Sequence, residues 1–575
     1  MTNAQIARVF HEIADALEIQ GAESFRVNAY RKIARAVDDY AGAVADLAAR
    51  GEVNTLPGVG KASAEKIEEL LTTGRVALRE ELRAVVPDSL LELLQIPSLG
   101  PKKAALLWKE RGIESIAQLR EAIDAGRLAG LKGLGDKSIA QLRHGIEFLA
   151  TSAGRVRLGD VWPLALRVRD EVAAIAGVRR AELAGSLRRG VETVGDLDVL
   201  CVAADGARVV ADFVALPRVK EVLVRGDTKG SVRVEVEDCG LIQVDLRVVP
   251  EESFGAAWQY FTGSKQHNVR LRELAQKRGW TLNEYSLSDG ERVIASRDEA
   301  DIYAAFGLPC FPPELREDRG EFELERVPAD LLTLQHIRGD LHMHTTASDG
   351  HHTIEEMAAA ARERGYEYIC ITDHSQSSVI ANGLKPERLR AHIAAVRAIA
   401  KKTRDVTVWV GAEVDILAEG RLDYPDELLA ELDFVVASVH TGMGQDIDAN
   451  TRRTIAAIRN PYVNLIGHPT GRLLNRREAM PLDVDAVSKA AAAAGCALEI
   501  NASSYRLDLK DQHARLARDN GATICIDCDA HATDQLDQMS LGVITARRAG
   551  LCRRDVLNTR TADQVRAFVQ ARRRT

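Results

Sequence analysis

Residues 185–200, GSLRRGVETVGDLDVL, place two aspartates, Asp196 and Asp198, at the start of an apolar run. A second apolar stretch, AELA, directly precedes the segment. In a strand, residues two apart share a face, so Asp196 and Asp198 are expected to point the same way. Two carboxylates this close repel each other and are usually exposed or bound to metal. The pattern predicts a strand that presents a pair of acids beside a hydrophobic core.

A third acid, Asp245, follows in LIQVDLRVV, where strand alternation puts it on the polar face. The stretch VRVEVEDCGLIQVDLRVV predicts a hairpin that carries Asp245 toward the first pair. Three convergent carboxylates can hold two Mg²⁺ ions for phosphoryl transfer. Upstream, the backbone of Gly185, the hydroxyl of Ser186 and the guanidinium of Arg189 suit a triphosphate. A surface loop with salt-bridged acids is the alternative, and the three-acid pattern disfavours it.

The same stretch closely resembles the palm of family X DNA polymerases, which include DNA polymerase beta. YFTGSKQHNVRLR and LNEY resemble that family too, as do FRVNAYRKIARAV and LPGVGKASAEKIEELL near the N-terminus. The resemblance extends to about Pro313. It implies that Asp196, Asp198 and Asp245 bind two Mg²⁺ or Mn²⁺ ions and that Asp245 accepts the primer 3′-hydroxyl proton.

The resemblance also implies a nucleotide site around the acids. Its expected residues are Gly185, Ser186, Arg189 and Gly195 at the triphosphate, Tyr260, Phe261 and Gly263 at the sugar, Asn268 at the base and Arg272 at the template strand. The chain departs from DNA polymerase beta at Gln243, where that protein has an arginine, and at Lys265, where it has an aspartate. Both departures bear on nucleotide preference and leave the reaction unchanged.

Three N-terminal segments repeat a glycine turn that opens a helix: LPGVGK, IPSLGPKK and LKGLGDK. Glycine allows close approach of the backbone, and a helix start offers unpaired N–H groups, so each turn suits a DNA phosphate. The segments resemble helix-hairpin-helix motifs, and three copies disfavour the alternative of ordinary helix starts. The expected DNA-binding residues are Gly58, Gly60, Lys61, Gly100, Lys102, Lys103, Gly133, Gly135 and Lys137. Ser98 replaces a glycine in the second copy, which predicts a weaker grip there.

Lys66 falls where the family's lyase lysine forms a Schiff base with an abasic sugar. A lysine can do this when its pKa is lowered. Ala62 replaces one of the family's neighbouring lysines. A phosphate contact or a solvated helix lysine remains an equal alternative for Lys66.

From residue 339 onward, strand-like apolar runs repeatedly end in a metal-ligand residue. The runs are GDLHMHTTASD, YEYICITDH, VTVWVGAEVDI, DFVVASVH, VNLIGHP, CALEIN and TICIDCDAH. Helical segments alternate with them, which predicts an α/β barrel with its functional groups at the C-terminal ends of the strands. The candidate ligands are His342, His344, Asp349, His374, Glu413, His440, His468, Asp529 and His531. The alternative, that these histidines are ordinary buried core residues, is disfavoured by nine such residues at successive strand ends. Imidazole together with carboxylate suits Zn²⁺, Mn²⁺ or Fe²⁺, and nine ligands can hold a cluster of about three ions.

These motifs resemble the PHP (polymerase and histidinol phosphatase) family, from about Gly339 to the last residue. The family pattern implies one ion on His342, His344, Glu413 and Asp529, with Glu413 bridging to a second ion on His440 and His468. It implies a third ion on Asp349, His374 and His531. Zn²⁺, Mn²⁺ or both are the expected ions. Cys525 and Cys528 are expected to contribute no ligand.

The expected fold class is multidomain α/β, with helical N-terminal domains, an α+β palm and a distorted seven-stranded TIM-like barrel. The expected domains are 1–85 (lyase-like), 86–152 (DNA-binding), 153–255 (palm), 256–316 (nucleotide selection), 317–335 (linker rich in proline and charge) and 336–575 (PHP). The chain of 575 residues carries a net charge of −8, so DNA contact must come from local basic groups. Eight cysteines without a disulfide pattern predict a reducing cytoplasm, and no apolar run is long enough to span a membrane. We also expect a monomer that associates with the bacterial nucleoid.

The leading hypothesis is a repair enzyme that fills short gaps in nicked or gapped duplex DNA with deoxynucleoside triphosphates. Its PHP site would trim 3′ ends and, as the resemblance implies, incise abasic sites. A second hypothesis makes the PHP site a small-phosphoester phosphatase. A third makes the chain a DNA-end-binding scaffold with inactive sites, which complete ligand sets at both sites disfavour.

Overall fold

The computed structural model describes residues 1, 3–38, 40, 44–56, 59–96, 99–131, 133–152 and 154–574. The chain forms two compact units: one covers residues 1–153, and the other starts at Gly154 and, apart from Asn475–Arg477, contains the rest. Within the described ranges, no helix combines the length and apolar composition that a bilayer crossing requires.

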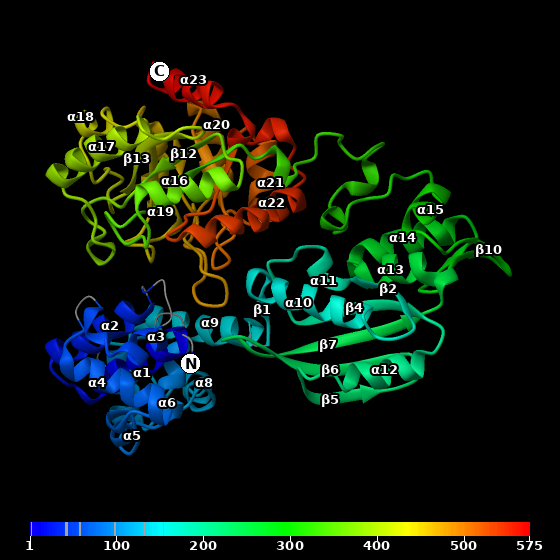
Figure 1. Ribbon diagram of the computed structural model, residues 1–575, viewed down its shortest axis with the longest axis horizontal. Helices are drawn as coiled ribbons and strands as arrows, with labels where there is room; N and C mark the ends of the chain where they lie inside the picture. Colours follow the sequence, from blue (N-terminus) through cyan, green and yellow to red (C-terminus); the bar gives the residue numbers. More distant parts are fainter. Residues whose placement is uncertain are drawn as a thin grey trace. The chain divides into compact units, whose positions relative to one another are not determined.

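The first unit is helical (Figure 1). In α1 (Asn3–Gln20), the buried residues Ile6, Phe10, Ile13 and Leu17 recur every three or four positions, which gives the helix one apolar stripe. The other helices are α2 (Ser24–Asp38), α3 (Val44–Arg50), α4 (Lys61–Thr73), α5 (Ala77–Arg83), α6 (Asp88–Glu92), α7 (Pro101–Arg111), α8 (Ile116–Asp124) and α9 (Asp136–Ser152). Buried side chains from along the unit form one hydrophobic cluster between them.

The second unit begins with a five-stranded sheet in the order β2-β4-β7-β6-β5. Its strands are β2 (Val178–Leu183), β4 (Asp196–Ala203), β5 (Val219–Arg225), β6 (Lys229–Val236) and β7 (Gly240–Val249). Only the β4–β7 pair within it is parallel. Apolar side chains of α10 (Leu158–Ala173) and α12 (Gly206–Val214) share a hydrophobic cluster with the sheet. The short α11 (Gly185–Arg188), β1 (Val156–Arg157) and β3 (Thr193–Val194) complete this palm.

A smaller subdomain follows, with its own core. It contains α13 (Phe254–Thr262), α14 (Lys265–Lys277), β8 (Thr281–Leu282), β9 (Leu287–Asp289), β10 (Arg292–Ala295) and α15 (Glu299–Ala305). The segment expected to be a linker packs on this subdomain. Glu321 is buried, lies 2.8 Å from His267 Nδ1, and accepts hydrogen bonds from the amides of Asp318 and Arg319. Charged residues of this segment therefore make specific contacts with the subdomain, whereas composition predicted a linker.

The rest of the chain forms a barrel of seven parallel strands, paired in chain order. They are β11 (Gly339–Met343), β12 (Tyr368–Ile371), β13 (Thr407–Asp415), β14 (Phe434–Ser438), β15 (Leu465–Ile466), β16 (Ala497–Asn501) and β17 (Thr523–Asp527). The helices are α16 (Ile354–Glu363), α17 (Pro386–Ala400), α18 (Asp426–Leu429), α19 (Ile447–Arg459), α20 (Val484–Ala494), α21 (Asp511–Asp519), α22 (Met539–Arg548) and α23 (Ala562–Arg572). A bridge from Met343 to Ala530 nearly closes the barrel. The predicted fold class is confirmed.

The barrel also packs directly on the palm. Three barrel leucines, Leu474, Leu507 and Leu541, belong to the hydrophobic cluster of the palm. A side-chain carbon added at Gly159 of the palm would lie 2.5 Å from Ser504 Cβ, so the two backbones approach closely there. Palm and barrel therefore share part of one core.

Candidate active sites

The palm acids occupy neighbouring positions on two strands. In the β4–β7 register, Asp198 pairs with Asp245 and Asp196 pairs with Gln243. Residues 242, 244 and 246 of β7 are buried while the alternate residues are half-buried, so the acids lie on the open face as predicted. The expected hairpin, β6 with β7, brings Asp245 there. Gln243 Nε2 donates a 3.0 Å hydrogen bond to Asp245, and Lys229 Nζ lies 3.7 Å from it.

The three carboxylates make a strongly negative site. Burial, with the nearby charges of Asp196 and Asp245, raises the pKa of Asp198 to about 7. Burial and the charge of Asp245 also raise the pKa of Asp196. A raised carboxylate pKa means that the fold supplies too little positive charge of its own. The donor set and its charge therefore fit divalent cations.

Gly185 lies against the acids. Its φ is +66°, and an added Cβ would sit 2.1 Å from Asp198 Oδ2. Only glycine offers this backbone conformation without overlapping the carboxylate. The residue therefore opens α11 directly beside the candidate metal ligands, and Ser186 follows in the same short helix.

Arg189 ends this turn between the palm and the smaller subdomain. Its Nε donates a 3.0 Å hydrogen bond to Glu317, and its Nη1 donates to the carbonyl oxygen of Thr262. The neighbouring Arg188 pairs with Glu299 instead, at 2.7 Å and 2.8 Å. Two arginines in sequence thus bind two different acids, and both also donate to Thr262, Arg188 to its hydroxyl and Arg189 to its carbonyl oxygen.

The sugar and base candidates lie on α13 and α14. The rings of Tyr260 and Phe261 pack edge to face, 5.2 Å apart. Asn268 Nδ2 donates to the carbonyl oxygen of Tyr260 at 2.7 Å, while its Oδ1 accepts from Gln259 at 2.8 Å. Gly263 joins the helices, with Arg189 Nη1 3.2 Å from where a Cβ would be.

Three further candidates lie at the edges of this region. Arg272 is exposed on α14, and Gly195 immediately precedes Asp196 at the start of β4. Lys265 is exposed at the first position of α14. These positions agree with the expected nucleotide site, whose residue roles stay predictions.

One backbone hydrogen bond recurs at each of the three hairpin turns. The amides of Val59, Leu99 and Leu134 donate to the carbonyl three residues earlier, each at 3.0 Å. Gly60, Gly100 and Gly135 then precede α4, α7 and α9. Of the lysines, Lys61, Lys102 and Lys137 are exposed and Lys103 is half-buried, and Gly133 has a φ of +97°. Gly58 lies outside the described residues.

Lys66 lies on α4, where its Nζ donates a 3.1 Å hydrogen bond to the carbonyl oxygen of Ala62. The side chain is half-buried. The amine therefore bonds to a carbonyl of its own helix, four residues earlier. The lyase role of Lys66 stays a prediction.

The barrel gathers all nine predicted ligands at the C-terminal ends of its strands. Glu413 stands at the centre, with its carboxylate oxygens 2.8–3.7 Å from five histidine rings. These are His342, His344, His374, His440 and His468. One fully buried carboxylate therefore contacts most of the imidazoles, which suits a bridge between ions.

The ligand atoms form three overlapping groups, each within 4.8 Å. They are His344, Asp349, His374 and His531; His342, His344 and Asp529; and His374, Glu413 and His440. Compared with the grouping that the family resemblance implied, His344 and His374 each belong to two groups. Cys525 and Cys528 are buried and belong to none of these groups among the described residues.

Two acids outside the predicted set orient the histidines. Glu499 Oε1 lies 2.7 Å from His342 Nδ1, and its other oxygen accepts from the amide of His468. Asp415 hydrogen-bonds to Nδ1 of His440. Carboxylates in this position fix the tautomer and ring angle of metal-binding histidines. The sequence signal for Glu499 was available, since CALEIN ends a strand run and no ligand was assigned to it.

The pKa values of the clustered histidines differ widely, because each ring has different charged neighbours. Burial and the neighbouring His531 and His374 lower the pKa of His344 to about 4, while burial and Arg506 lower that of His468 to about 3. Burial opposes protonation of His440 too, but Glu413 and Asp415 raise its pKa to about 10. His344 and His468 thus keep free lone pairs at neutral pH.

The donor set fits metal ions. Among the described residues, the buried atoms His342 Nε2 and Glu413 Oε2 have no partner in hydrogen-bonding geometry, although His374 Nδ1 lies 2.8 Å from Glu413 Oε2. Such atoms are costly to bury unless something coordinates them. Imidazole and carboxylate ligands suit Zn²⁺ or Mn²⁺.

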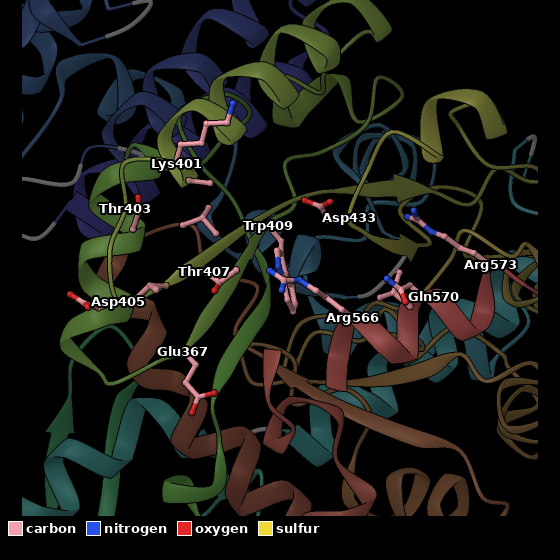
Figure 2. A pocket seen from close by; sticks show the side chains of 14 residues that line it. Glu367, Lys401, Thr403, Asp405, Thr407, Trp409, Asp433, Arg566, Gln570 and Arg573 are labelled. Atoms are coloured by element: carbon pink, nitrogen blue, oxygen red, sulfur yellow. The ribbon is translucent and has the colours of Figure 1, made fainter. Parts of the chain in front are cut away.

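A cavity of about 680 Å³ opens at the other end of the barrel (Figure 2). The lining includes Thr407 and Trp409 at the start of β13, Arg566 of α23 and Arg573 just after that helix. The ligand cluster lies at the opposite strand ends, so this cavity is separate from the candidate metal centre.

Known families match most of these parts. The helix-hairpin-helix domain matches residues 1–76, the SAM-like helix-hairpin-helix tandem 90–146, the DNA polymerase beta thumb 257–317 and the PHP domain 340–503. The chain is 37% identical over 572 residues to the DNA polymerase/3′-5′ exonuclease PolX of Bacillus subtilis (strain 168), covering 99% of this chain and all of that one.

Two other relatives match parts of the chain. A probable phosphatase of Thermoanaerobacter sp. (strain X514) is 32% identical over 247 residues, which cover 41% of this chain and 95% of that protein. DNA polymerase lambda of Rattus norvegicus is 27% identical over 341 residues, which cover 55% and 56%.

Proposed function

Because the chain belongs to the family X DNA polymerases with helix-hairpin-helix domains and a C-terminal PHP domain, we propose that its two clusters of acids divide two reactions. The protein is a DNA-directed DNA polymerase with 3′–5′ exonuclease activity, suited to gap-filling repair. The palm acids carry nucleotide addition, and the barrel cluster carries hydrolysis. The juxtaposition of Asp198 and Asp245 in the sheet register is the observation that supports the first assignment best.

In the polymerase reaction, Asp196, Asp198 and Asp245 hold two Mg²⁺ or Mn²⁺ ions, which when bound neutralise the triphosphate and acidify the primer hydroxyl. Asp245 accepts the proton of the primer 3′-hydroxyl. The amide of Gly185, the hydroxyl of Ser186 and the guanidinium of Arg189 bind the triphosphate. Tyr260, Phe261 and Gly263 surround the sugar, Asn268 faces the base, and Arg272 contacts the template; Gly195 lies at the triphosphate.

In the nuclease reaction, the nine barrel ligands hold about three Zn²⁺ or Mn²⁺ ions, which when bound supply Lewis acidity and a nucleophile at neutral pH. His342 and His440 are oriented by Glu499 and Asp415, so their Nε2 atoms face Glu413. The DNA substrate is gapped or nicked duplex, held through its backbone by the three hairpins. The barrel also incises abasic sites. The protein acts as a monomer in the bacterial cytoplasm, at the nucleoid.

A labelled gapped duplex tests this division directly. We expect primer extension with Mg²⁺ and deoxynucleoside triphosphates, and shortening of the 3′ end with Mn²⁺ alone. Extension without any shortening would remove the nuclease assignment, and shortening without extension would remove the polymerase assignment.

Phosphatase action on a small phosphoester is a second candidate for the barrel, because a relative that is 32% identical over 247 residues is named a probable phosphatase. The helix-hairpin-helix matches elsewhere in the chain favour DNA. Competition decides between them: gapped DNA should inhibit hydrolysis of a chromogenic phosphoester at a concentration near its own Kd. Hydrolysis indifferent to DNA would favour the small substrate.

A further inference from the structure

The barrel contacts the polymerase nucleotide loop, residues 185–195, at consecutive positions. Arg548, at the end of barrel helix α22, donates from Nη1 to the carbonyl oxygen of Arg189 at 2.7 Å. Asp511 holds Arg548 in place through contacts of 3.1 Å and 2.9 Å. Gly190 follows, and a Cβ there would lie 2.1 Å from Ile544 of the same helix. The loop therefore rests on α22.

A second path leads from Arg548 to the side chain of Arg189. The same Nη1 donates to Glu317 Oε1 at 2.9 Å, and this oxygen also accepts from Arg189 Nε at 3.0 Å. Arg189 Nη1 donates to the carbonyl oxygen of Thr262, so two of the three guanidinium nitrogens of Arg189 make hydrogen bonds. Nη2 has no hydrogen-bond partner among the described residues. The guanidinium is thus fixed and keeps one free edge.

A second barrel arginine binds the far side of the loop. Arg472 contacts both oxygens of Glu192, at 3.1 Å and 2.7 Å, and it also donates to the carbonyl oxygen of Leu507. Its side chain is 10% exposed, so water screens this pair only partly. Glu192 stands four residues before Asp196, the first metal-ligand candidate of β4.

We propose that Arg548 and Arg472 of the barrel are positioning residues of the polymerase, which hold the triphosphate loop in its binding conformation independently of the nuclease chemistry. The proposal rests on the proposed function, since it assigns Arg189 to the triphosphate. Neither arginine needs to contact the nucleotide. Each fixes a loop residue on one side of Gly190, and a small displacement of an anchored binding group weakens substrate binding.

Steady-state extension on a gapped duplex tests the proposal in the full-length protein. We expect Arg548→Ala to raise the KM for deoxynucleoside triphosphate about tenfold, the typical consequence of losing a charged hydrogen bond, while kcat stays within about twofold. Arg548→Lys, which keeps one donor, should recover part of the KM. Arg566→Ala is the matched control, because this arginine is exposed on α23 and its ion pair with Asp563 lies within the same helix.

Charge exchange tests the second contact. Glu192→Arg or Arg472→Glu alone should raise the KM, and the two together should return it toward the wild-type value. The proposal is overturned if Arg548→Ala leaves the KM unchanged, or if the double variant is no better than the singles. Should Arg548→Ala lose extension and trimming together, the charge exchange decides alone. A wild-type protein that extends no primer would refute the proposed function instead.

Discussion

Asp198 and Asp245 lie side by side on two neighbouring parallel strands, paired directly by the β4–β7 register. Parallel neighbours in an otherwise antiparallel sheet bring together residues separated by a whole hairpin and a helix. Gly185 lies against Asp198, so the carboxylates meet the loop proposed to bind the triphosphate.

Replacing Asp198 by alanine should abolish nucleotide addition. Removing a ligand that holds metal against the triphosphate costs several kcal/mol of charge stabilisation, a loss on the order of 10³ in rate or more. Trimming of the 3′ end should persist, because the barrel keeps all its ligands. Gel assays for longer and shorter products measure both activities. Normal extension by this variant would refute the metal assignment.

Mg²⁺ binding to the palm should weaken as pH falls below about 7. The pKa of Asp198 is raised from 3.8 to about 7 in the folded protein, so protons compete with the cation there. Affinity should fall up to about tenfold per pH unit below 7. Calorimetric titration of the nucleotide-free protein at pH 6, 7 and 8 measures this. An affinity independent of pH would contradict the shift.

The stability of the metal-free protein should fall as pH rises, whereas Mg²⁺ affinity should increase. A carboxylate whose pKa rises on folding contributes stability below its unfolded pKa, and that contribution is lost as pH rises through about 7. Mg²⁺ should therefore raise the Tm more at pH 8 than at pH 6. The same rise at both pH values would argue against this linkage.

Glu413→Ala should eliminate trimming and any abasic-site incision while extension with Mg²⁺ remains. Because Glu413 contacts five histidines, its loss should release more than one bound ion per chain. Elemental analysis after dialysis counts the ions. Glu427→Ala, at an exposed position of α18, serves as control. Trimming that survives here but disappears in Asp198→Ala would place the nuclease in the palm.

Lys102→Ala and Lys137→Ala should weaken DNA binding equally across sequences. Each lost phosphate contact should reduce the slope of log K against log salt by about 0.9. Lys109→Ala, at the other end of α7 from the turn, should change the slope less. Fluorescence anisotropy on several duplexes gives the values. A loss confined to one sequence would show base recognition instead of backbone contact.

Borohydride should trap the protein on an incised abasic site if Lys66 forms a Schiff base. Lys66→Arg keeps the charge but cannot form the imine, so it should not trap. The hydrogen bond from Lys66 to the carbonyl of Ala62 must break first. Equal trapping by the arginine variant would assign the lyase to another amine or remove it.

Local patterns predicted much of both sites. Period-two alternation located Asp196, Asp198 and Asp245 on one face, and the repeated strand ends located the barrel and the nine candidate ligands. Such features depend on neighbouring residues in the chain, which sequence displays directly. The confirmed fold class follows from the same patterns.

Contacts between distant residues could not be predicted this way. Arg548 and Arg189 are 359 positions apart, and nothing beside either residue indicates its partner. Glu499 was missed because its role depends on a contact with His342, 157 positions earlier in the chain. The charged segment before the barrel was expected to be a linker, yet the contact between Glu321 and His267 joins it to the preceding subdomain.

The shared core of palm and barrel limits where the chain can be truncated. Leu474, Leu507 and Leu541 fill the palm core from the barrel, so a chain shortened before residue 336 would leave apolar palm surface open to water. Such a fragment should aggregate unless new polar residues cover that face. A premature stop codon that removes the barrel would therefore also eliminate the polymerase activity, so both activities depend on one intact reading frame.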